Sequence, residues 1–409
     1  MYINRLIQKT LKDALKTFPV VLITGPRQSG KTTLVKEVLG KRFNYVSLDE
    51  IDIRSLAADD PRTFLKQYPN PVIIDEIQNV GELLSYIKAL VDQDRKPGQW
   101  VLTGSQQFSL MRNISESLAG RVAILNLYPF SLSEINKNFN IRLANAESYI
   151  KHLLNLKGGT KSDISVGKWL LLGGYPELIV KKNIIKKLWF SSYVQTYIDR
   201  DVRGNIKNNN LNDFERFVKI LASMTGQELK YSIISRQIGV SIPTIKSWVS
   251  FLEASSIIYL LYPYQKNFKK RVIKSPKCYF VDTGLASFLV GLQDEKHLLQ
   301  GPMSGALFET ACIMQFVKRF SALMDNCSLY FYRSIDGHEV DLLIETADKV
   351  YPIEIKLSST IKSRHADNIK VWLDLSGDKE GGKGLVISTS EYNGFVADNV
   401  KNCHFSLLT

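Results

Sequence analysis

The sequence predicts an α/β protein with a parallel sheet at its N-terminal end, followed by further domains. Three observations carry this prediction. An apolar run at residues 20–23 leads into a glycine-rich loop and a helical pattern, and further apolar runs recur near residues 44, 72, 100 and 121 with helix-compatible stretches between them. Strands that alternate with helices form a parallel sheet covered on both faces. The chain has 409 residues, 44% of them apolar, and should hold about two to four domains.

The glycine-rich loop has the spacing of a phosphate-binding loop. Residues 25–32 match GxxxxGK[ST] and stand between the first strand and a helix. In such a loop backbone N–H groups wrap the phosphates, Lys31 reaches the β- and γ-phosphates and assists catalysis, and Thr32 holds Mg²⁺. The alternative, a chance match on a flexible loop, does not explain this context. The expected nucleotide contacts are Gly25, Pro26, Arg27, Gln28, Ser29, Gly30, Lys31, Thr32 and Thr33.

Two carboxylates follow the apolar run near residue 72. Asp75 and Glu76 end this strand directly. We expect Asp75 to bind Mg²⁺ through water and Glu76 to activate the attacking water, although a solvated acidic turn has the same pattern. The strand that starts at residue 100 ends in Thr103 and Ser105, at the edge where open α/β sheets bind ligands, and either hydroxyl could sense the γ-phosphate.

The middle of the chain contains a helix-turn-helix pattern at residues 232–245. Gly239 supplies the turn and Ser241 the cap of the second helix. Strands expected at 257–264 and 277–281 enclose a basic tip, which completes a winged helix. We expect Thr244, Lys246, Ser247 and Ser250 to face a DNA groove, and Lys266, Lys269, Lys270 and Arg271 to touch phosphates.

Nearly all of the formal net charge of +13 falls in this middle segment. Residues 181–280 hold 18 Lys or Arg against six Asp or Glu, a net +12, whereas the other 309 residues carry +1. A basic surface of this kind favours an anionic partner, and with a winged helix the partner is expected to be DNA. The alternative is that the winged helix packs against other domains and its charge is a solvated face.

The C-terminal residues predict the order helix, three strands, helix, strand. Asp341 precedes Glu354 by 13 positions, and Glu354 and Lys356 share one face of a strand because they are two residues apart. With Glu309 on the preceding helix, this set resembles the PD-(D/E)xK nuclease superfamily. The chain departs from the usual motif, because Val340 stands where a proline normally precedes the aspartate.

The nuclease resemblance implies a role for each of these side chains. Asp341, Glu354 and Glu309 would hold Mg²⁺ beside a scissile phosphate, and Lys356 would position or activate water, so that Asp341, Glu354 and Lys356 are the catalytic set. Glu339 lies on the same strand face as Asp341 and could join the site or be a solvated neighbour. Carboxylates also alternate with apolar residues on ordinary strands, so an inactive domain of this fold is the alternative.

Motifs along most of the chain resemble the AAA-type ATPases, and in particular a prokaryotic family that joins such an ATPase to a C-terminal domain of unclear role. They lie at residues 25–32, 72–78, 102–106, 118–121, 127–130, 173–176 and 279–285. The resemblance implies ATP hydrolysis with ATP and Mg²⁺ as cofactors. Sites of this type are often completed across subunits by an arginine, which makes a homo-oligomer compatible with it. The candidates are Arg121, Arg200 and Arg203, each of which could instead be a structural ion-pair partner.

Other features of the sequence indicate a cytoplasmic protein. The first residues lack the pattern of a signal peptide, and no apolar run approaches the roughly 20 residues that span a bilayer. The four cysteines have no CxxC spacing, so buried, reduced thiols are expected.

We therefore expect four domains. They are a P-loop ATPase core over residues 1–130, a helical lid over 131–207, a winged helix over 208–285 and a PD-(D/E)xK-like domain over 286–409. Two functions follow from this arrangement. The chain is either an ATPase coupled to an active DNA nuclease, or an ATP-dependent switch whose nuclease-like domain is inactive and only binds DNA or a protein partner.

Overall fold

The computed structural model describes residues 2–40, 42–105, 117–137, 145–156, 165–181, 183–197, 211–265 and 275–409. The chain forms two compact units. The N-terminal unit comprises residues 1–130 with the short segments 250–257 and 321–323, and the C-terminal unit comprises the rest. None of the helices among the described residues is long and apolar enough to cross a membrane. All four cysteines are free thiols; Cys278, Cys312 and Cys403 are buried as predicted, whereas Cys327 is half-buried.

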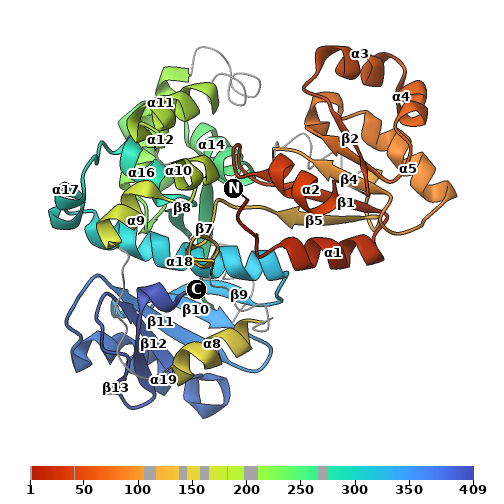
Figure 1. The fold of residues 1–409 in the computed structure, drawn as a ribbon. Coiled ribbons are helices and arrows are strands. Elements are labelled where there is room, and N and C mark those ends of the chain that lie inside the picture. The colour runs from red at the N-terminus through yellow and green to blue at the C-terminus, as the bar shows by residue number, and fades with distance from the viewer. Residues whose placement is uncertain are drawn as a thin grey trace. The chain divides into compact units, whose positions relative to one another are not determined.

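The N-terminal unit is built on a five-stranded parallel sheet with the strand order β2-β3-β4-β1-β5. The strands are β1 (Val20–Thr24), β2 (Asn44–Ser47), β3 (Val72–Asp75), β4 (Trp100–Thr103) and β5 (Val122–Asn126). Every residue of β1, β3 and β4 is buried, which is the pattern of central strands covered on both faces. The predicted parallel sheet is thus confirmed, and Figure 1 shows its strands in red to orange.

Helices alternate with these strands along the chain. They are α1 (Gln8–Thr17), α2 (Lys31–Leu39), α3 (Ile51–Asp59), α4 (Pro61–Gln67), η1 (Ile77–Val80) and α5 (Leu83–Gln93). The strand order places β4 between β1 and β3, so that the carboxyl ends of these three strands lie side by side. Ile23 pairs with Thr103, and Ile74 pairs with Leu102. Ligands of open parallel sheets bind at this edge, so the fold brings three segments far apart in sequence to one place.

The C-terminal unit contains a mixed nine-stranded sheet in the described residues, with the order β13-β14-β12-β11-β10-β9-β7-β8-β6. The strands are β6 (Gln227–Glu228), β7 (Ile258–Pro263), β8 (Lys277–Phe280), β9 (Ser328–Arg333), β10 (Glu339–Glu345), β11 (Val350–Lys356), β12 (Gly384–Ser388), β13 (Phe395–Ala397) and β14 (Val400–His404). The predicted order of helix, three strands, helix and strand is found as α18 (Ser304–Leu323), β9, β10, β11, α19 (Asp367–Glu380) and β12. Strands β13 and β14 were not predicted.

The helices after residue 130 fall into three groups. The first contains α7 (Leu132–Ile135), α8 (Ala146–Asn155), α9 (Val166–Leu172), α10 (Pro176–Val180) and α11 (Lys186–Tyr197). The second contains α12 (Leu211–Ser223), α13 (Tyr231–Ile238), α14 (Ile242–Ala254), α16 (Thr283–Leu289) and α17 (Glu295–Gln300). The last contains α18 (Ser304–Leu323) and α19 (Asp367–Glu380), of which α19 packs on β10 and β11.

The strands expected on either side of the basic tip belong to the same sheet as the C-terminal strands. β7 pairs antiparallel with β8 and parallel with β9, where Tyr262 lies beside Tyr330. Helix α13 ends at Gly239, whose φ of 88° allows the turn into α14. The tip residues Lys266, Lys269, Lys270 and Arg271 lie outside the described residues. The domain boundaries at 207/208 and 285/286 stay predictions.

Candidate functional site

The loop between β1 and α2 has a backbone that requires glycine. Gly25 has a φ of 139°, and a Cβ at this position would lie 2.2 Å from the carbonyl oxygen of Leu127. Gly30 is left-handed, with a φ of 93°, and Gln28 is left-handed without being glycine. Residues other than glycine rarely have a left-handed backbone outside functional loops, because this conformation costs about 1–3 kcal/mol per residue. The loop therefore holds a shape that Gly25 and Gly30 permit.

Lys31 begins α2 and lies within this loop. Its Nζ donates to the carbonyl oxygens of Gly25 and Pro26, each at 3.0 Å, and its side chain is buried. The ammonium is thus held at the centre of the loop, at the N-terminal end of a helix. Both features attract phosphate oxygens.

Asp75, at the end of β3, gathers hydroxyl groups from three other elements. Its Oδ2 accepts from Thr32 Oγ1 and Tyr45 Oη, each at 2.8 Å, and its Oδ1 accepts from Thr103 Oγ1. Burial and the neighbouring Asp75 carboxylate raise the pKa of Tyr45, which stays protonated as a donor. Adjacent ligands of octahedral Mg²⁺ lie about 2.9 Å apart, given bonds of about 2.0–2.1 Å. The Thr32 and Asp75 oxygens therefore fit the ion, either directly or with Asp75 acting through water.

Glu76 follows Asp75 with a left-handed backbone, at a φ of 58°. Its N–H donates to Thr103 Oγ1 at 3.3 Å, and its carboxylate accepts from the amide of Gln78. Thr103 on β4 therefore links the carboxylate of Asp75 to the backbone of Glu76. Ser105 Oγ is buried and has no hydrogen-bond partner in the part of the chain that the structure describes. A buried hydroxyl in this state can still bond to a ligand.

Sequence reasoning missed two side chains of this site, Tyr45 and Arg5. The Arg5 guanidinium is buried, donates to Ser29 O at 2.9 Å and Tyr128 O at 2.5 Å, and lies 4.5 Å from the centre of the Phe130 ring. It ties the phosphate-binding loop to the segment after β5. No spacing signal marks either residue, because each reaches the site from an element without a motif.

The arginine candidates for a site completed across subunits have different outcomes. Arg121 Nε pairs with Asp92 Oδ1 at 2.5 Å, and its Nη1 donates to Ala119 O at 3.0 Å, which is the structural role weighed as the alternative. Arg200 and Arg203 lie outside the described residues.

The second site lies in the C-terminal unit, where β10 and β11 run side by side. Lys356 Nζ is 2.7 Å from Glu354 Oε1 and 3.7 Å from Asp341 Oδ2, so both carboxylates face one ammonium. The backbone N–H of Ile355 donates to Asp341 Oδ2 at 2.8 Å. Glu354 Oε2 is buried without a hydrogen-bond partner among the described residues. Burial and the charge of Asp341 raise the pKa of Glu354.

Glu309 joins this cluster from α18, together with two residues of β8 that sequence reasoning missed. Lys277 Nζ lies 3.2 Å from Glu309 Oε1 and 2.5 Å from Glu339 Oε1, and Tyr279 Oη donates to Glu309 Oε1 at 2.6 Å. Burial and Asp341 raise the pKa of Glu309. Burial lowers the pKa of Lys277, but the surrounding carboxylates outweigh this and keep its pKa above the ordinary lysine value.

The carboxylate cluster fits Mg²⁺ in part. The orphaned Glu354 oxygen and the raised pKa values of two glutamic acids indicate acceptors that a cation would stabilise. Within the described ranges, however, no three His, Cys, Asp or Glu side chains form a group that could hold a metal ion. Asp341 and Glu354 therefore fit a cation as a pair, while Glu309 is bound to Lys277 and Tyr279.

The second helix of the helix-turn-helix presents a polar face. Lys246, Ser247 and Ser250 are exposed, whereas Thr244 is half-buried and its N–H donates to the Ser241 hydroxyl at 3.3 Å. The opposite face is anchored by Trp248, whose ring centre lies 5.4 Å from that of Phe214 and 5.3 Å from that of Phe217. Three of the four residues expected to face a groove are therefore accessible.

Residues 17–136 match the model of the AAA domain, a range that includes the loop at 25–32 and the carboxylates Asp75 and Glu76. The N-terminal unit is an AAA-type P-loop ATPase domain, and the match supports ATP binding and hydrolysis. Residues 165–296 and 304–408 match two models that are each described as a domain of unknown function.

Two mycobacterial proteins match most of the chain. The uncharacterized proteins Rv2008c of Mycobacterium tuberculosis and Mb2031c of Mycobacterium bovis are each 30% identical over 353 residues, which is 86% of this chain and 73% of theirs. The chain belongs to their family. A more distant uncharacterized protein of Haemophilus influenzae is 19% identical over 391 residues, covering 90% of this chain and 88% of its own.

The solved structures that match this chain resemble it only distantly. The Walker-type ATPase paby2304 of Pyrococcus abyssi is 18% identical, covers 69% of this chain and 94% of its own, and has a TM-score of 0.39. The RuvB Holliday junction branch migration motor of Thermotoga maritima is 16% identical, covers 63% of this chain and 89% of its own, and has a TM-score of 0.27. These TM-scores are too low to support a functional comparison.

Proposed function

We propose that this chain is an ATP-driven protein that engages DNA and cuts it with Mg²⁺. The observation that carries the proposal is the convergence of Asp341, Glu354 and Lys356 on adjacent strands, with one ammonium between two buried carboxylates. This is the arrangement that phosphodiester cleavage needs, because the carboxylates hold a cation and the lysine offsets charge that develops on the phosphate.

At the ATP site each side chain has a proposed role. Lys31 contacts the β- and γ-phosphates, while Thr32 and Asp75 hold Mg²⁺, which neutralises phosphate charge when it is bound. Glu76 accepts a proton from the attacking water, and Thr103 keeps Glu76 and Asp75 in register through its hydrogen bonds. The backbone and side chains of the loop from Gly25 to Thr33, together with Ser105, complete the nucleotide contacts.

DNA would be bound by the basic middle segment, residues 181–280. The exposed face of α14, with Lys246, Ser247 and Ser250, suits a groove, and the net +12 of residues 181–280 supplies attraction to phosphates. We assign residues 208–285 to a winged helix and 286–409 to a PD-(D/E)xK-like domain. If about five phosphates are contacted, the logarithm of the binding constant should fall with the logarithm of salt concentration at a slope near −4.5.

The test compares wild type with Lys356→Ala on plasmid and single-stranded DNA, with Mg²⁺ and with EDTA. We expect the wild type to cleave at least one substrate and the variant to lose cleavage while it still binds DNA. The ATPase rate is measured on the same preparation, with and without DNA. Equal cleavage by the two proteins would contradict the nuclease assignment. An ATPase rate that does not change when DNA is added would contradict coupling between ATP hydrolysis and DNA binding.

A second function is favoured by the position of Lys277. Its ammonium is buried between Glu309 and Glu339, where it neutralises carboxylates that a fully loaded metal site would use. In this alternative the nuclease-like domain is inactive, and the chain is an ATP-dependent switch that binds DNA or a protein partner. Absence of cleavage by the wild type, combined with an ATP-dependent change in DNA affinity, would select this function.

A further inference from the structure

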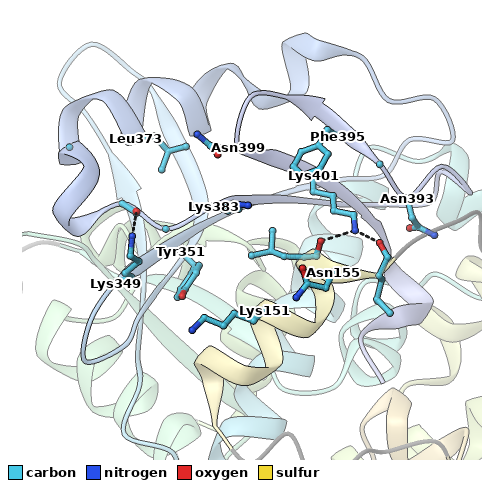
Figure 2. Close-up of a pocket in the computed structure, with 16 residues that line it drawn as sticks. Lys151, Asn155, Lys349, Tyr351, Leu373, Lys383, Asn393, Phe395, Asn399 and Lys401 are labelled. Atoms are coloured by element: carbon cyan, nitrogen blue, oxygen red, sulfur yellow. Dashed lines mark hydrogen bonds between the residues drawn. The ribbon is translucent and has the colours of Figure 1, made fainter.

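The C-terminal unit has a pocket that is separate from the carboxylate cluster. Its volume is about 740 Å³, and it is formed by α8, the start of β11, the end of α19 and the loops around β13 and β14. Figure 2 shows the residues that surround it. Tyr351 lines the pocket at the beginning of β11, whereas Glu354 and Lys356 stand near the end of that strand and, by the alternation of side chains, on its opposite face.

The charged side chains that line this pocket, among the residues described, are all lysines: Lys151, Lys349, Lys383 and Lys401. This all-basic lining differs from the surrounding sequence, because residues 281–409 hold only 12 Lys or Arg against 17 Asp or Glu. Glu147 pairs with Lys151 at 2.5 Å and offsets part of the charge. A cleft lined by one sign of charge concentrates ligands of the opposite sign.

The four lysines divide into a structural one and others that can reach a ligand. Lys401 is buried, and its Nζ donates to Leu154 O at 2.8 Å and to Leu156 O, so it holds the last turn of α8 against β14. Lys349 is exposed, and within the described part of the chain its Nζ makes only one long hydrogen bond, 3.4 Å to Gly381 O. Lys383 is exposed and forms no hydrogen bond or ion pair with another described residue. Lys349 and Lys383 therefore supply the donors for an anion.

Aromatic and amide side chains at the pocket indicate more than a simple anion. Phe395 lines the pocket with 59% of its surface exposed, and the neighbouring Tyr392 is 56% exposed and donates its hydroxyl to Phe395 O at 3.1 Å. The amides of Asn155 and Asn399 also line it. Exposed aromatic rings beside lysines stack nucleobases, and amides can bond to base edges.

We propose that this pocket binds a nucleotide unit, with its phosphate at Lys349 and Lys383 and its base against Phe395. The pocket volume lies within the range of about 300–1,000 Å³ that small-molecule sites occupy. The unit is either a free nucleotide or part of a single nucleic-acid strand, which share this chemistry. Ligand binding in this pocket does not depend on whether the carboxylate cluster cleaves DNA.

The experiment uses the full chain with Lys31→Ala, so that the ATP site does not dominate nucleotide binding. Fluorescence anisotropy follows a labelled oligothymidylate strand and, separately, a fluorescent ADP analogue. The pocket variant Lys349→Glu/Lys383→Glu is compared with the control Lys168→Glu/Lys296→Glu, which reverses two exposed lysines on α9 and α17. Circular dichroism melts verify that both variants fold.

The pocket variant should bind at least one ligand about tenfold more weakly than the control, because charge reversal repels phosphate. For a strand, losing two phosphate contacts should also reduce the salt slope by about 1.4. If the pocket variant binds only the strand more weakly, the natural ligand is part of a nucleic-acid strand. If it binds the ADP analogue more weakly, the natural ligand is a free nucleotide. Equal affinities of the pocket variant and the control for both ligands would overturn the proposal.

Phe395→Ala separates a nucleotide from a bare phosphate. Loss of stacking should weaken binding about tenfold with little change in the salt slope, since stacking is not ionic. A lysine effect without a Phe395 effect would refute the nucleotide assignment. Loss of strand binding in Lys246→Glu but not in the pocket variant, together with unchanged binding of the ADP analogue by the pocket variant, would overturn this site and leave the DNA-binding proposal for α14 intact.

Discussion

Replacing Lys277 by methionine removes the ammonium that Glu309 and Glu339 share. Nζ lies 3.2 Å from Glu309 Oε1 and 2.5 Å from Glu339 Oε1, and only 5% of the lysine side chain is exposed. Methionine keeps most of the buried volume but carries no charge. Burial and Asp341 already raise the pKa of Glu309, so ionising that carboxyl without Lys277 becomes still less favourable.

Removing one partner of a buried ion pair costs about 3–5 kcal/mol, so Lys277→Met should lower the free energy of unfolding by about that amount near pH 8. The loss of unfolding free energy should be smaller near pH 5, which is close to the ordinary glutamate pKa of about 4.3. At that pH Glu309 is protonated and needs no counter-charge. The sign follows from linkage: the carboxyl pKa is raised in the folded state, so ionisation above the unfolded pKa works against folding.

Urea unfolding followed by tryptophan fluorescence measures this difference at both pH values. Lys296→Met, which changes an exposed lysine of α17, is the matched control and should leave stability unchanged within about 0.5 kcal/mol. If Lys277→Met is as stable as this control at both pH values, the buried ion-pair network does not stabilise the unit and the reasoning fails.

Three further predictions concern the two candidate sites. Lys31→Ala should abolish ATP binding, whereas Glu76→Gln should keep binding and lose about 10²–10⁴ in kcat, which calorimetry and a phosphate-release assay distinguish; unchanged hydrolysis in both would refute the assignments. Gly25→Ala should destabilise the loop by about 1–3 kcal/mol and weaken ATP binding, because its Cβ would meet Leu127 O at 2.2 Å, and a wild-type dissociation constant would contradict this. The affinity for Mn²⁺, measured by calorimetry without nucleotide, should rise with pH above the ordinary glutamate pKa. Because the pKa of Glu354 is raised, this carboxyl keeps a proton that a bound cation must displace. Glu354→Gln should remove the pH dependence.

At the nucleotide site the sequence predicted the groups that lie within continuous motifs. The glycine loop, Asp75 and Glu76 each follow an apolar run directly, and strand ends of a parallel sheet meet at one edge. Their roles remain proposals, but their proximity could be expected. Tyr45 and Arg5 could not be found in this way, because an ordinary tyrosine in a strand and an arginine near the N-terminus have no spacing that marks them.

In the C-terminal unit the sequence predicted less of the site than it did at the nucleotide site. The spacing of Glu354 and Lys356 predicted a shared strand face, and the structure brings Asp341 to the same ammonium. Lys277 and Tyr279 lie on β8, which the sequence associated with the winged helix rather than with the carboxylates. They reach Glu309 and Glu339 because β7 pairs with both β8 and β9, a connection that joins residues more than 50 positions apart.

Local sequence was enough for the parallel sheet, the phosphate-binding loop and the carboxylates that end or alternate along strands, because periodicity and turn chemistry act over a few residues. Tertiary structure alone decided which cation neutralises which carboxylate and which lysines gather around one pocket. Those outcomes depend on strand order and burial. The +12 of residues 181–280 is visible in the sequence, but the ion pairs of Lys277 and the pocket formed by Lys151 with Lys349 and Lys383 exist only after segments far apart in the chain have packed together.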